Sequence, residues 1–409
     1  MKKKFSNSSK CIKFLIMILV LSLALVGCQD NDNTPTGEAN TDNQIEDVAI
    51  EDTDDEIIDE DTGLVYESSM DLKYAESFSV DYYKGGYKTI TDWTGRKTLL
   101  VPEGKEIPEV KDGVDIIQLP LETIGAFSTT IATELRPLDL MDKLSLVTTD
   151  IDKWHIPEIK EMMEEGKITY VGKNSAPDYE LIQAANPDLI LISSGTSHGG
   201  NETIEKFDEL GVKWIGHGNQ RETDPRGRLE WIKLSGALFD KEKEAEDFFN
   251  AQLKKIEEVE GKLASTESEV KTFATTFLSG DVYYVRNKGD YEVKMFELAG
   301  GEYIFRDLNP DMDGNTKMNA EELYKGIADV DIFFYNNING PSIQSISDLI
   351  DNADYLGDVK AVKEGNVWGF KSHYYQSGDN VADMINDLYT ILTTPQGEIT
   401  ETEYYFLMD

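Results

Sequence analysis

Residues Asp240 to Ala264 read DKEKEAEDFFNAQLKKIEEVEGKLA, and the organisation of the chain can be worked out from them. Their main apolar residues fall on one face of a helix with 3.6 residues per turn: Ala245, Phe248, Phe249, Leu253, Ile256, Val259 and Leu263. Glu and Lys are interleaved over the other faces. Such a helix spans roughly 37 Å, about the width of a small domain, so we expect it to lie on other structure along most of its length.

Two interpretations of this helix are open. It is either a long surface helix inside one large domain, or a rigid connection between two lobes with a ligand cleft between them. The second is favoured because the chain on either side of the helix reads as a separate α/β domain, and 409 residues are enough for two domains beyond a leader.

The charge of the chain excludes some functions. Its 78 acidic and 39 basic residues give a net charge of −39 at pH 7. We find no basic stripe that could neutralise nucleic-acid phosphates, and direct adsorption to anionic lipid is equally disfavoured. Part of the acid excess is local, since residues 29–62 contain fourteen Asp and Glu and no Lys or Arg.

The N-terminus has the pattern of a lipoprotein leader. Residues 1–13 contain five lysines, and Phe14–Val26 is an apolar run of thirteen residues broken only by Ser22, which is short for a membrane span and typical of a signal peptide. The run ends in Leu25-Val26-Gly27-Cys28, which resembles the bacterial lipobox, so we expect Cys28 to be lipidated and to become the new N-terminus. An ordinary signal peptide or N-terminal anchor with an incidental cysteine is the alternative.

The leader and its flanking segment define the first two domain boundaries. We expect a signal peptide over residues 1–27 and, over 28–80, the lipidated cysteine followed by an acidic, disordered tether. Cys11 is the only other cysteine and lies in the leader, so the folded part should contain no disulfide and no thiolate metal site.

An N-terminal lobe is expected over residues 81–239. Thr89–Pro102 predicts a hairpin turning at Thr94-Gly95. After it, β-rich runs at 116–120, 144–149, 168–171, 189–193 and 212–216 alternate with predicted helices near 130–140, 156–165, 178–185 and 201–210. Asp224-Pro225 is typical of a helix N-cap followed by proline in the first turn. This alternation indicates a mostly parallel sheet.

The same alternation returns in a C-terminal lobe over residues 266–409, after the connecting helix at 240–265. Strands are predicted at 271–278, 282–286, 331–335 and 366–370, with helices near 290–298, 319–326, 343–350 and 379–392. The predicted fold class is therefore α/β, with two Rossmann-like lobes of mostly parallel sheets joined by one long α-helix.

Three phrases of the sequence resemble a known family. Val171–Ile190 contains V-G, then D-Y-E-L-I and N-P-D-L-I; Phe296–Phe305 reads FELAGGEYIF, and Ala361–Trp368 reads AVKEGNVW. In this order they resemble ABC-transporter substrate-binding proteins for iron chelates, cobalamin and haem, over residues 88–393. The resemblance implies two α/β lobes bridged by one helix, and a small-molecule ligand passed to a membrane permease. It also implies that Glu180 and Glu297, one in each lobe, form salt bridges with permease arginines; both could instead be ordinary solvated carboxylates.

Candidate ligand-binding residues come from loops that follow predicted strands, where ligands of parallel α/β sheets bind. An iron chelate is bulky, often anionic and partly aromatic, so its site needs cationic, aromatic and amide or hydroxyl groups. The candidates are Thr129, Trp154, His155, His198, His217, Arg221, Tyr284, Arg286, Asn287, His373, Tyr374 and Tyr375. All four histidines of the chain are among them.

Each candidate has an alternative role. Tyr284 and Tyr374 could pack in the core, Arg286 could pair with an acidic side chain, and any one histidine could be exposed or internally bonded. We expect Trp154 in the cleft, because an indole in a polar loop has no obvious core to enter. His373, Tyr374 and Tyr375 could ligate haem or iron directly.

The expected function is capture of a siderophore-type iron chelate for an ABC importer by a monomeric, membrane-anchored, extracytoplasmic protein. Cobalamin or haem could be the ligand instead. A glycine-rich phosphate loop, an H-E-x-x-H motif and a cysteine nucleophile are absent, so we expect neither enzymatic activity nor a resident metal or cofactor. A secreted metal-dependent enzyme and a sensor without a transport role are the other classes.

Overall fold

The computed structural model describes residues 56–193, 200–265 and 269–409. The predicted leader, Cys28, the first part of the predicted tether and His198 lie outside the described residues. Among the described helices, none is both long and apolar enough to span a bilayer.

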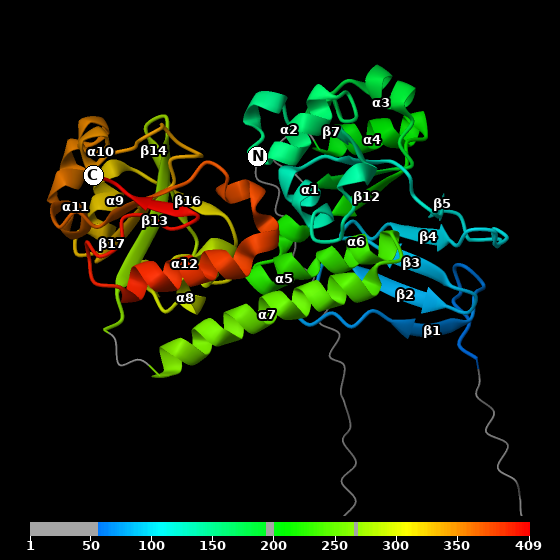
Figure 1. Cartoon of the computed structure of the whole chain (residues 1–409), viewed down its shortest axis with the longest axis horizontal. Helices are drawn as coiled ribbons and strands as arrows, with labels where there is room; N and C mark the ends of the chain where they lie inside the picture. The colour runs from blue at the N-terminus through cyan, green and yellow to red at the C-terminus, as the bar shows by residue number, and fades with distance from the viewer. Residues whose placement is uncertain (1–55, 194–199, 266–268) are drawn as a thin grey trace, which may run out of the picture. The chain divides into compact units, whose positions relative to one another are not determined.

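A five-stranded parallel sheet forms the centre of the N-terminal lobe (Figure 1). Its order is β12-β11-β6-β7-β8, with β6 at Ile124–Ala126, β7 at Leu144–Val147, β8 at Thr169–Tyr170, β11 at Leu189–Ser193 and β12 at Trp214–His217. The helices are α1 (Thr129–Leu135), α2 (Pro157–Glu164), α3 (Tyr179–Ala185) and α4 (Gly200–Leu210). A short β9–β10 pair at Gly172–Lys173 and Ala176–Pro177 precedes α3. The parallel α/β prediction for this lobe is confirmed.

A second sheet precedes the parallel one. It contains β1 (Tyr66–Ser69), β2 (Ser79–Tyr83), β3 (Tyr87–Thr91), β4 (Lys97–Val101) and β5 (Val114–Gln118) in chain order. β1 to β4 pair antiparallel, which confirms the predicted hairpin, whereas β5 joins β4 in parallel rather than entering the central sheet.

The folded part begins earlier than residue 81, the predicted boundary of the tether. β1 and β2 lie in the stretch assigned to the tether, and two buried glutamates hold the segment between them. Glu230 accepts hydrogen bonds from the amides of Lys73, Tyr74 and Ala75, and Glu222 accepts from the next two amides. These partners lie about 150 residues away, so local composition gave no sign of them.

The connecting helix is α7, Glu242–Ser265. Before it come the short helix η3 (Asn219–Arg221), α5 (Pro225–Glu230) and α6 (Ile232–Leu238), and Asp224 is the N-cap of α5, as predicted. α7 packs against α6 of one lobe and α12 (Val381–Thr393) of the other, and Figure 1 shows it running beneath both. Its buried residues Ala245, Phe249, Ile256 and Val259 belong to a core cluster that continues into both lobes. The predicted long helix between two lobes is confirmed.

The C-terminal lobe is built on a seven-stranded mixed sheet. Its order is β16-β14-β13-β17-β18-β19, with β15 also pairing with β13. The strands are β13 (Thr272–Ser279), β14 (Val282–Arg286), β15 (Glu302–Tyr303), β16 (Asn315–Met318), β17 (Ile332–Tyr335), β18 (Val367–Phe370) and β19 (Tyr405–Leu407). β13, β15, β17 and β18 are parallel, and β14, β16 and β19 are antiparallel to their neighbours. The helices besides α12 are α8 (Tyr291–Leu298), α9 (Ala320–Ile327), α10 (Ile346–Asn352) and α11 (Lys360–Lys363).

Candidate ligand-binding site

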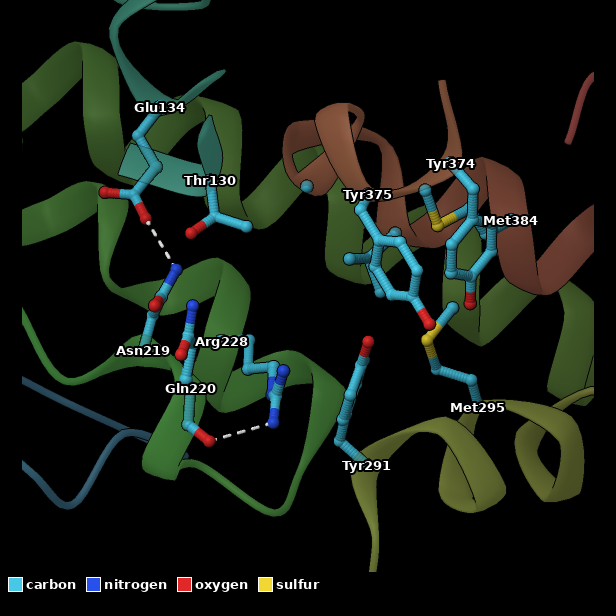
Figure 2. A pocket seen from close by; sticks show the side chains of 12 residues that line it. Thr130, Glu134, Asn219, Gln220, Arg228, Tyr291, Met295, Tyr374, Tyr375 and Met384 are labelled. Carbon is cyan, nitrogen blue, oxygen red and sulfur yellow. Dashed lines mark hydrogen bonds between the residues drawn. The ribbon is translucent and has the colours of Figure 1, made fainter. Parts of the chain in front are cut away.

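A cavity between the lobes is lined by side chains from both (Figure 2). Its volume is about 60 Å³, less than the roughly 300–1,000 Å³ of small-molecule sites, so a bulky ligand can enter only when the lobes move apart. The N-terminal lobe contributes Thr130 and Glu134 of α1, Asn219 and Gln220 of η3, and Arg228 of α5. The C-terminal lobe contributes Tyr291, Met295, Tyr374, Tyr375, Gly378, Val381 and Met384.

Arg228 supplies a positive charge to this cavity. Its Nε donates to the carbonyl oxygen of Glu222 at 2.9 Å, and its Nη2 donates to that of Gln220 at 3.0 Å. Its guanidinium carbon lies 3.3 Å from the centroid of the Tyr291 ring, across the boundary between the lobes. Burial lowers the pKa of Arg228, but a guanidinium stays protonated at neutral pH. Within the described part of the chain no carboxylate forms an ion pair with it, and the more distant Asp290 and Asp313 compensate its charge only in part.

The helix that carries Arg228 is held firmly at both ends. Asp224 accepts a hydrogen bond from the amide of Arg226 at 2.8 Å and caps α5. Glu222 before the helix and Glu230 at its end bind the amides of the segment 73–77. That segment passes so close that a Cβ added at Gly227 would lie 2.9 Å from the carbonyl oxygen of Tyr74. The orientation of Arg228 is therefore fixed by the fold before any ligand arrives.

Glu134 lies at another part of the cavity wall and is already bonded. Its Oε2 lies 2.9 Å from Nε2 of His217, and its Oε1 accepts from Asn219 Nδ2 at 3.3 Å. His217 is fully buried and packs on the indole of Trp231, with the ring centroids 4.5 Å apart. His217 was predicted to contact the ligand, but it does not line the cavity and is bonded to Glu134, which does.

Three tyrosines give the cavity its aromatic surface. Burial raises the pKa of Tyr291 to about 12 and raises the pKa values of Tyr374 and Tyr375 further, so all three are neutral phenols at physiological pH. The hydroxyl of Tyr375 accepts hydrogen bonds from Asn336 Nδ2 at 2.5 Å, Asn339 Nδ2 at 2.9 Å and a guanidinium nitrogen of Arg286 at 3.2 Å. Tyr374 and Tyr375 are thus predicted residues that line the cavity.

Arg286 does not line the cavity. Its Nη2 donates to Glu292 Oε2 at 2.9 Å, and a second carboxylate, Asp290, lies 3.6 Å from its Nη1. Burial opposes the charge, but Glu292 and the other acids outweigh it and raise the pKa of Arg286. Its charge is therefore compensated inside the lobe, and its contact with Tyr375 makes it a support of the cavity wall.

Five other candidates do not line the cavity. Trp154 is only 1% exposed, because its indole packs in the core and donates to the carbonyl oxygen of Thr149, so the expectation of a cleft position is wrong. Asn287 binds the carbonyl oxygen of Asp313 and is also buried. Arg221 stacks over Trp93, and Tyr284 stacks on Phe277, both away from the cavity. Thr129 is half-buried next to Thr130, which does line the cavity.

His155 and His373 meet at a second, polar groove between the lobes. This groove is also lined by Arg136, Gln376 and Glu403. His155 Nδ1 lies 3.4 Å from Ser372 Oγ, and His373 Nε2 lies 3.6 Å from Glu403 Oε1. Burial, with Lys160 and His373 adding to it, lowers the pKa of His155. In the described residues no group of three or more His, Cys, Asp or Glu side chains is arranged to hold a metal ion.

The segment around His198 lies outside the described residues, as Cys28 does. Gly195–Gly199 reads G-T-S-H-G, which has the G-x-S-x-G spacing of a hydrolase nucleophile elbow. In the chain it lies between β11 and α4.

The two carboxylates implied in permease docking differ in their surroundings. Glu180 is exposed in the first turn of α3. Glu297 lies in the last turn of α8, where its Oε2 is 2.5 Å from Lys288 Nζ, and it lines an open groove with Asp224, Arg226 and Glu260.

Arg228, Tyr291 and Glu134 are cavity residues that loop-based reasoning missed, because all three lie on helices. From the sequence alone, an arginine on a helix is expected to be an exposed surface charge. One signal was present: α5 starts at a predicted N-cap directly after the loop His217–Arg221, so its first turns had to lie near the predicted cleft.

The chain is similar to proteins of a known family. Residues 131–374 match the family described as periplasmic binding protein. An uncharacterized lipoprotein of Methanocaldococcus jannaschii is 29% identical over 355 residues, covering 78% of this chain and 81% of the relative.

Solved structures show the same fold. A periplasmic heme binding protein from Pseudomonas aeruginosa matches with a TM-score of 0.56 at 13% identity, over 71% of this chain and 99% of that one. A possible iron-binding (periplasmic solute-binding) protein from Staphylococcus epidermidis matches with a TM-score of 0.54 at 16% identity, over 67% and 99%. The strands β1 to β5 precede the residues that match the family.

Proposed function

The chain belongs to the periplasmic binding protein family, whose members bind small molecules for ABC importers, and on that premise we propose that it captures an anionic, siderophore-type iron chelate between its lobes. The observation that carries the proposal is the guanidinium of Arg228, which faces a cavity lined by three neutral tyrosines and forms no ion pair with any carboxylate of the described residues. A half-buried cation of this kind favours a ligand that brings the negative charge. The tyrosine faces and Met295 and Met384 suit the apolar, aromatic part of such a chelate.

The ligand panel that tests this proposal varies charge and ring type separately. We expect a ferric tris-catecholate, which is anionic and aromatic, to raise the melting temperature, by an amount equivalent to about 2.7 kcal/mol at a hundred times its Kd. A neutral ferric tris-hydroxamate, haem and cyanocobalamin complete the panel, and the visible spectrum of the bound chelate confirms binding. Stabilisation by cyanocobalamin or haem alone would replace the siderophore with that ligand and leave the importer role in place.

A catalytic role is the second candidate, because the G-x-S-x-G spacing at Gly195–Gly199 lies between a strand and a helix. Ester substrates incubated with the protein test it. We expect no turnover above that of a Ser197→Ala variant, since the cavity offers binding groups and the family transports its ligands.

Membrane attachment through Cys28 is part of the same proposal. With Cys28→Ala we expect complete loss of labelled palmitate incorporation and release of the protein from membranes, or retention only with the leader uncleaved. The physical reason is that a diacylglyceryl group brings two acyl chains, enough for stable anchoring, whereas an acidic surface does not adhere to anionic lipid. Cys11→Ala is the matched control and should stay labelled; label in the Cys28 variant would refute lipidation at this position.

A further inference from the structure

One segment of the C-terminal lobe, Ser372–Asn380, contacts both the cavity and the opposite lobe. It connects β18 to α12 and contains two short helices, η5 (Tyr374–Gln376) and η6 (Gly378–Asn380). We refer to it as the latch segment. Gln376 and Asp379, which bond across the lobe boundary, are buried, and neighbouring residues of the same segment line the cavity.

The strongest contact of the latch segment is a two-point ion pair. Arg136 at the end of α1 donates through Nε to Asp379 Oδ2 at 2.9 Å and through Nη2 to Asp379 Oδ1 at 2.6 Å. Asp379 is 7% exposed, and its hydrogen bonds raise the pKa of Arg136. A bidentate pair of this kind fixes orientation as well as distance. It joins two residues 243 positions apart that belong to different lobes.

The amide of Gln376 makes a second contact. Its Oε1 accepts from the backbone N–H of His155 at 2.7 Å, and its Nε2 donates to the carbonyl oxygen of Lys153 at 2.7 Å. The side chain therefore bridges two backbone groups of the N-terminal lobe, as a strand neighbour would. Gly378 also comes close: a Cβ there would lie 3.3 Å from Thr133 Oγ1 on α1.

The cavity side of the latch segment carries Tyr374, Tyr375 and Gly378. Tyr375 is anchored to its own lobe through Arg286, Asn336 and Asn339. A ligand that packs on these tyrosines therefore contacts the same short segment that is bonded to the other lobe. Figure 2 shows the two tyrosines on the C-terminal side of the cavity, facing the α1 and α5 residues.

We propose that the latch segment couples ligand binding to lobe closure, with the Arg136–Asp379 pair and the Gln376 bridge as the contacts that must break before the ligand leaves. This inference rests on the proposed function for the identity of the cavity as the ligand site. α7 is a continuous helix that resists bending, so we expect the two lobes to move relative to each other by only a small amount. A small movement is nevertheless enough to separate short contacts of this kind. Hydrogen bonds at 2.6–2.9 Å to a buried carboxylate are lost within a movement of one to two ångströms.

The test compares Asp379→Asn and Gln376→Ala with a matched control. Asp115→Asn makes the same chemical change in an Arg–Asp pair that lies wholly within the N-terminal lobe, with Arg96. We expect Asp379→Asn to raise the dissociation rate of ferric tris-catecholate, the probe used here, about tenfold, while the association rate changes less than threefold. Gln376→Ala should raise it several-fold, and Asp115→Asn should leave it within twofold of the parent. Combining Arg136→Gln with Asp379→Asn should add nothing to the single change, because both remove the same pair.

A second readout needs no ligand. X-ray scattering of the ligand-free parent and variants should show a larger radius of gyration for Asp379→Asn and Gln376→Ala, and no change for Asp115→Asn. Unchanged dissociation in Asp379→Asn, with the probe bound, overturns the latch and leaves the proposed function standing. If the parent does not bind the probe, the proposed function fails, and unchanged scattering of the two latch variants then overturns the latch independently.

Discussion

Replacing Arg228 with alanine is expected to weaken binding of a ferric tris-catecholate by roughly ten- to a hundredfold. A hydrogen bond to a charged group contributes about 1.5–3 kcal/mol, and each 1.4 kcal/mol is a factor of ten in Kd. The loss should be near the upper end, because Arg228 has no carboxylate partner in the described structure and its position is fixed by two carbonyl oxygens and the Tyr291 ring. Isothermal titration of the parent and variant with the same chelate measures the effect.

Two further variants test whether the effect comes from the guanidinium of Arg228 itself. Arg228→Lys keeps the charge but loses the planar fork, so it should recover only part of the affinity. Arg226→Ala, two residues away on α5, is the matched control: Arg226 pairs with Asp224 and faces a different groove, so affinity should stay within twofold. If Arg228→Ala itself binds within twofold of the parent, the charge does not recognise the ligand, and a neutral corrinoid becomes the better candidate.

The fold was accessible from the sequence because its signals are local. The apolar face of Glu242–Ser265, the N-cap at Asp224 and the hairpin turn at Thr94-Gly95 each depend on residues within one or two turns of each other. The two errors in architecture were of another kind. The early start of the folded part and the position of β5 depend on partners far along the chain, such as Glu230 for the amides at 73–75.

The candidate site was only partly accessible for the same reason. Loop position identified Tyr374 and Tyr375, and it placed Arg286 correctly near the cavity wall. It did not show that Glu292 and Asp290 already compensate the charge of Arg286, or that His217 stands behind Glu134. Pairings of this kind decide which polar residue is free for a ligand, and they form only when the lobes fold. Arg228 is the converse case, since its proposed role depends on its having no ion-pair partner among the described residues.

The remaining prediction concerns delivery. The double charge reversal Glu180→Lys with Glu297→Lys is expected to reduce uptake at least tenfold, with ligand affinity and melting temperature nearly unchanged. Close charge pairs across protein interfaces have coupling energies of about 1.5–7 kcal/mol, and reversal replaces attraction by repulsion. Neither glutamate lines the cavity, so binding itself should be spared. Uptake of radiolabelled chelate into cells, beside titration of the purified variant, separates the two quantities. The reversal of Glu257 and Glu258, exposed on α7, alters net charge equally and should not affect uptake.

Single variants distinguish the two carboxylates, because their surroundings are different. Glu180 is exposed and makes no ion pair within the described residues, so Glu180→Gln should already lower uptake several-fold. Glu297 is paired with Lys288 and lies on α8, which Figure 1 shows beside α7, whereas α3 lies at the far edge of the other lobe. On the docking hypothesis a permease arginine would compete with Lys288 for Glu297, so Glu297→Gln should have the smaller effect, and Lys288→Ala should leave uptake intact or raise it. Loss of chelate affinity in parallel with uptake would place these carboxylates in the binding site or the fold instead. Full uptake by the double reversal would remove both from the docking surface.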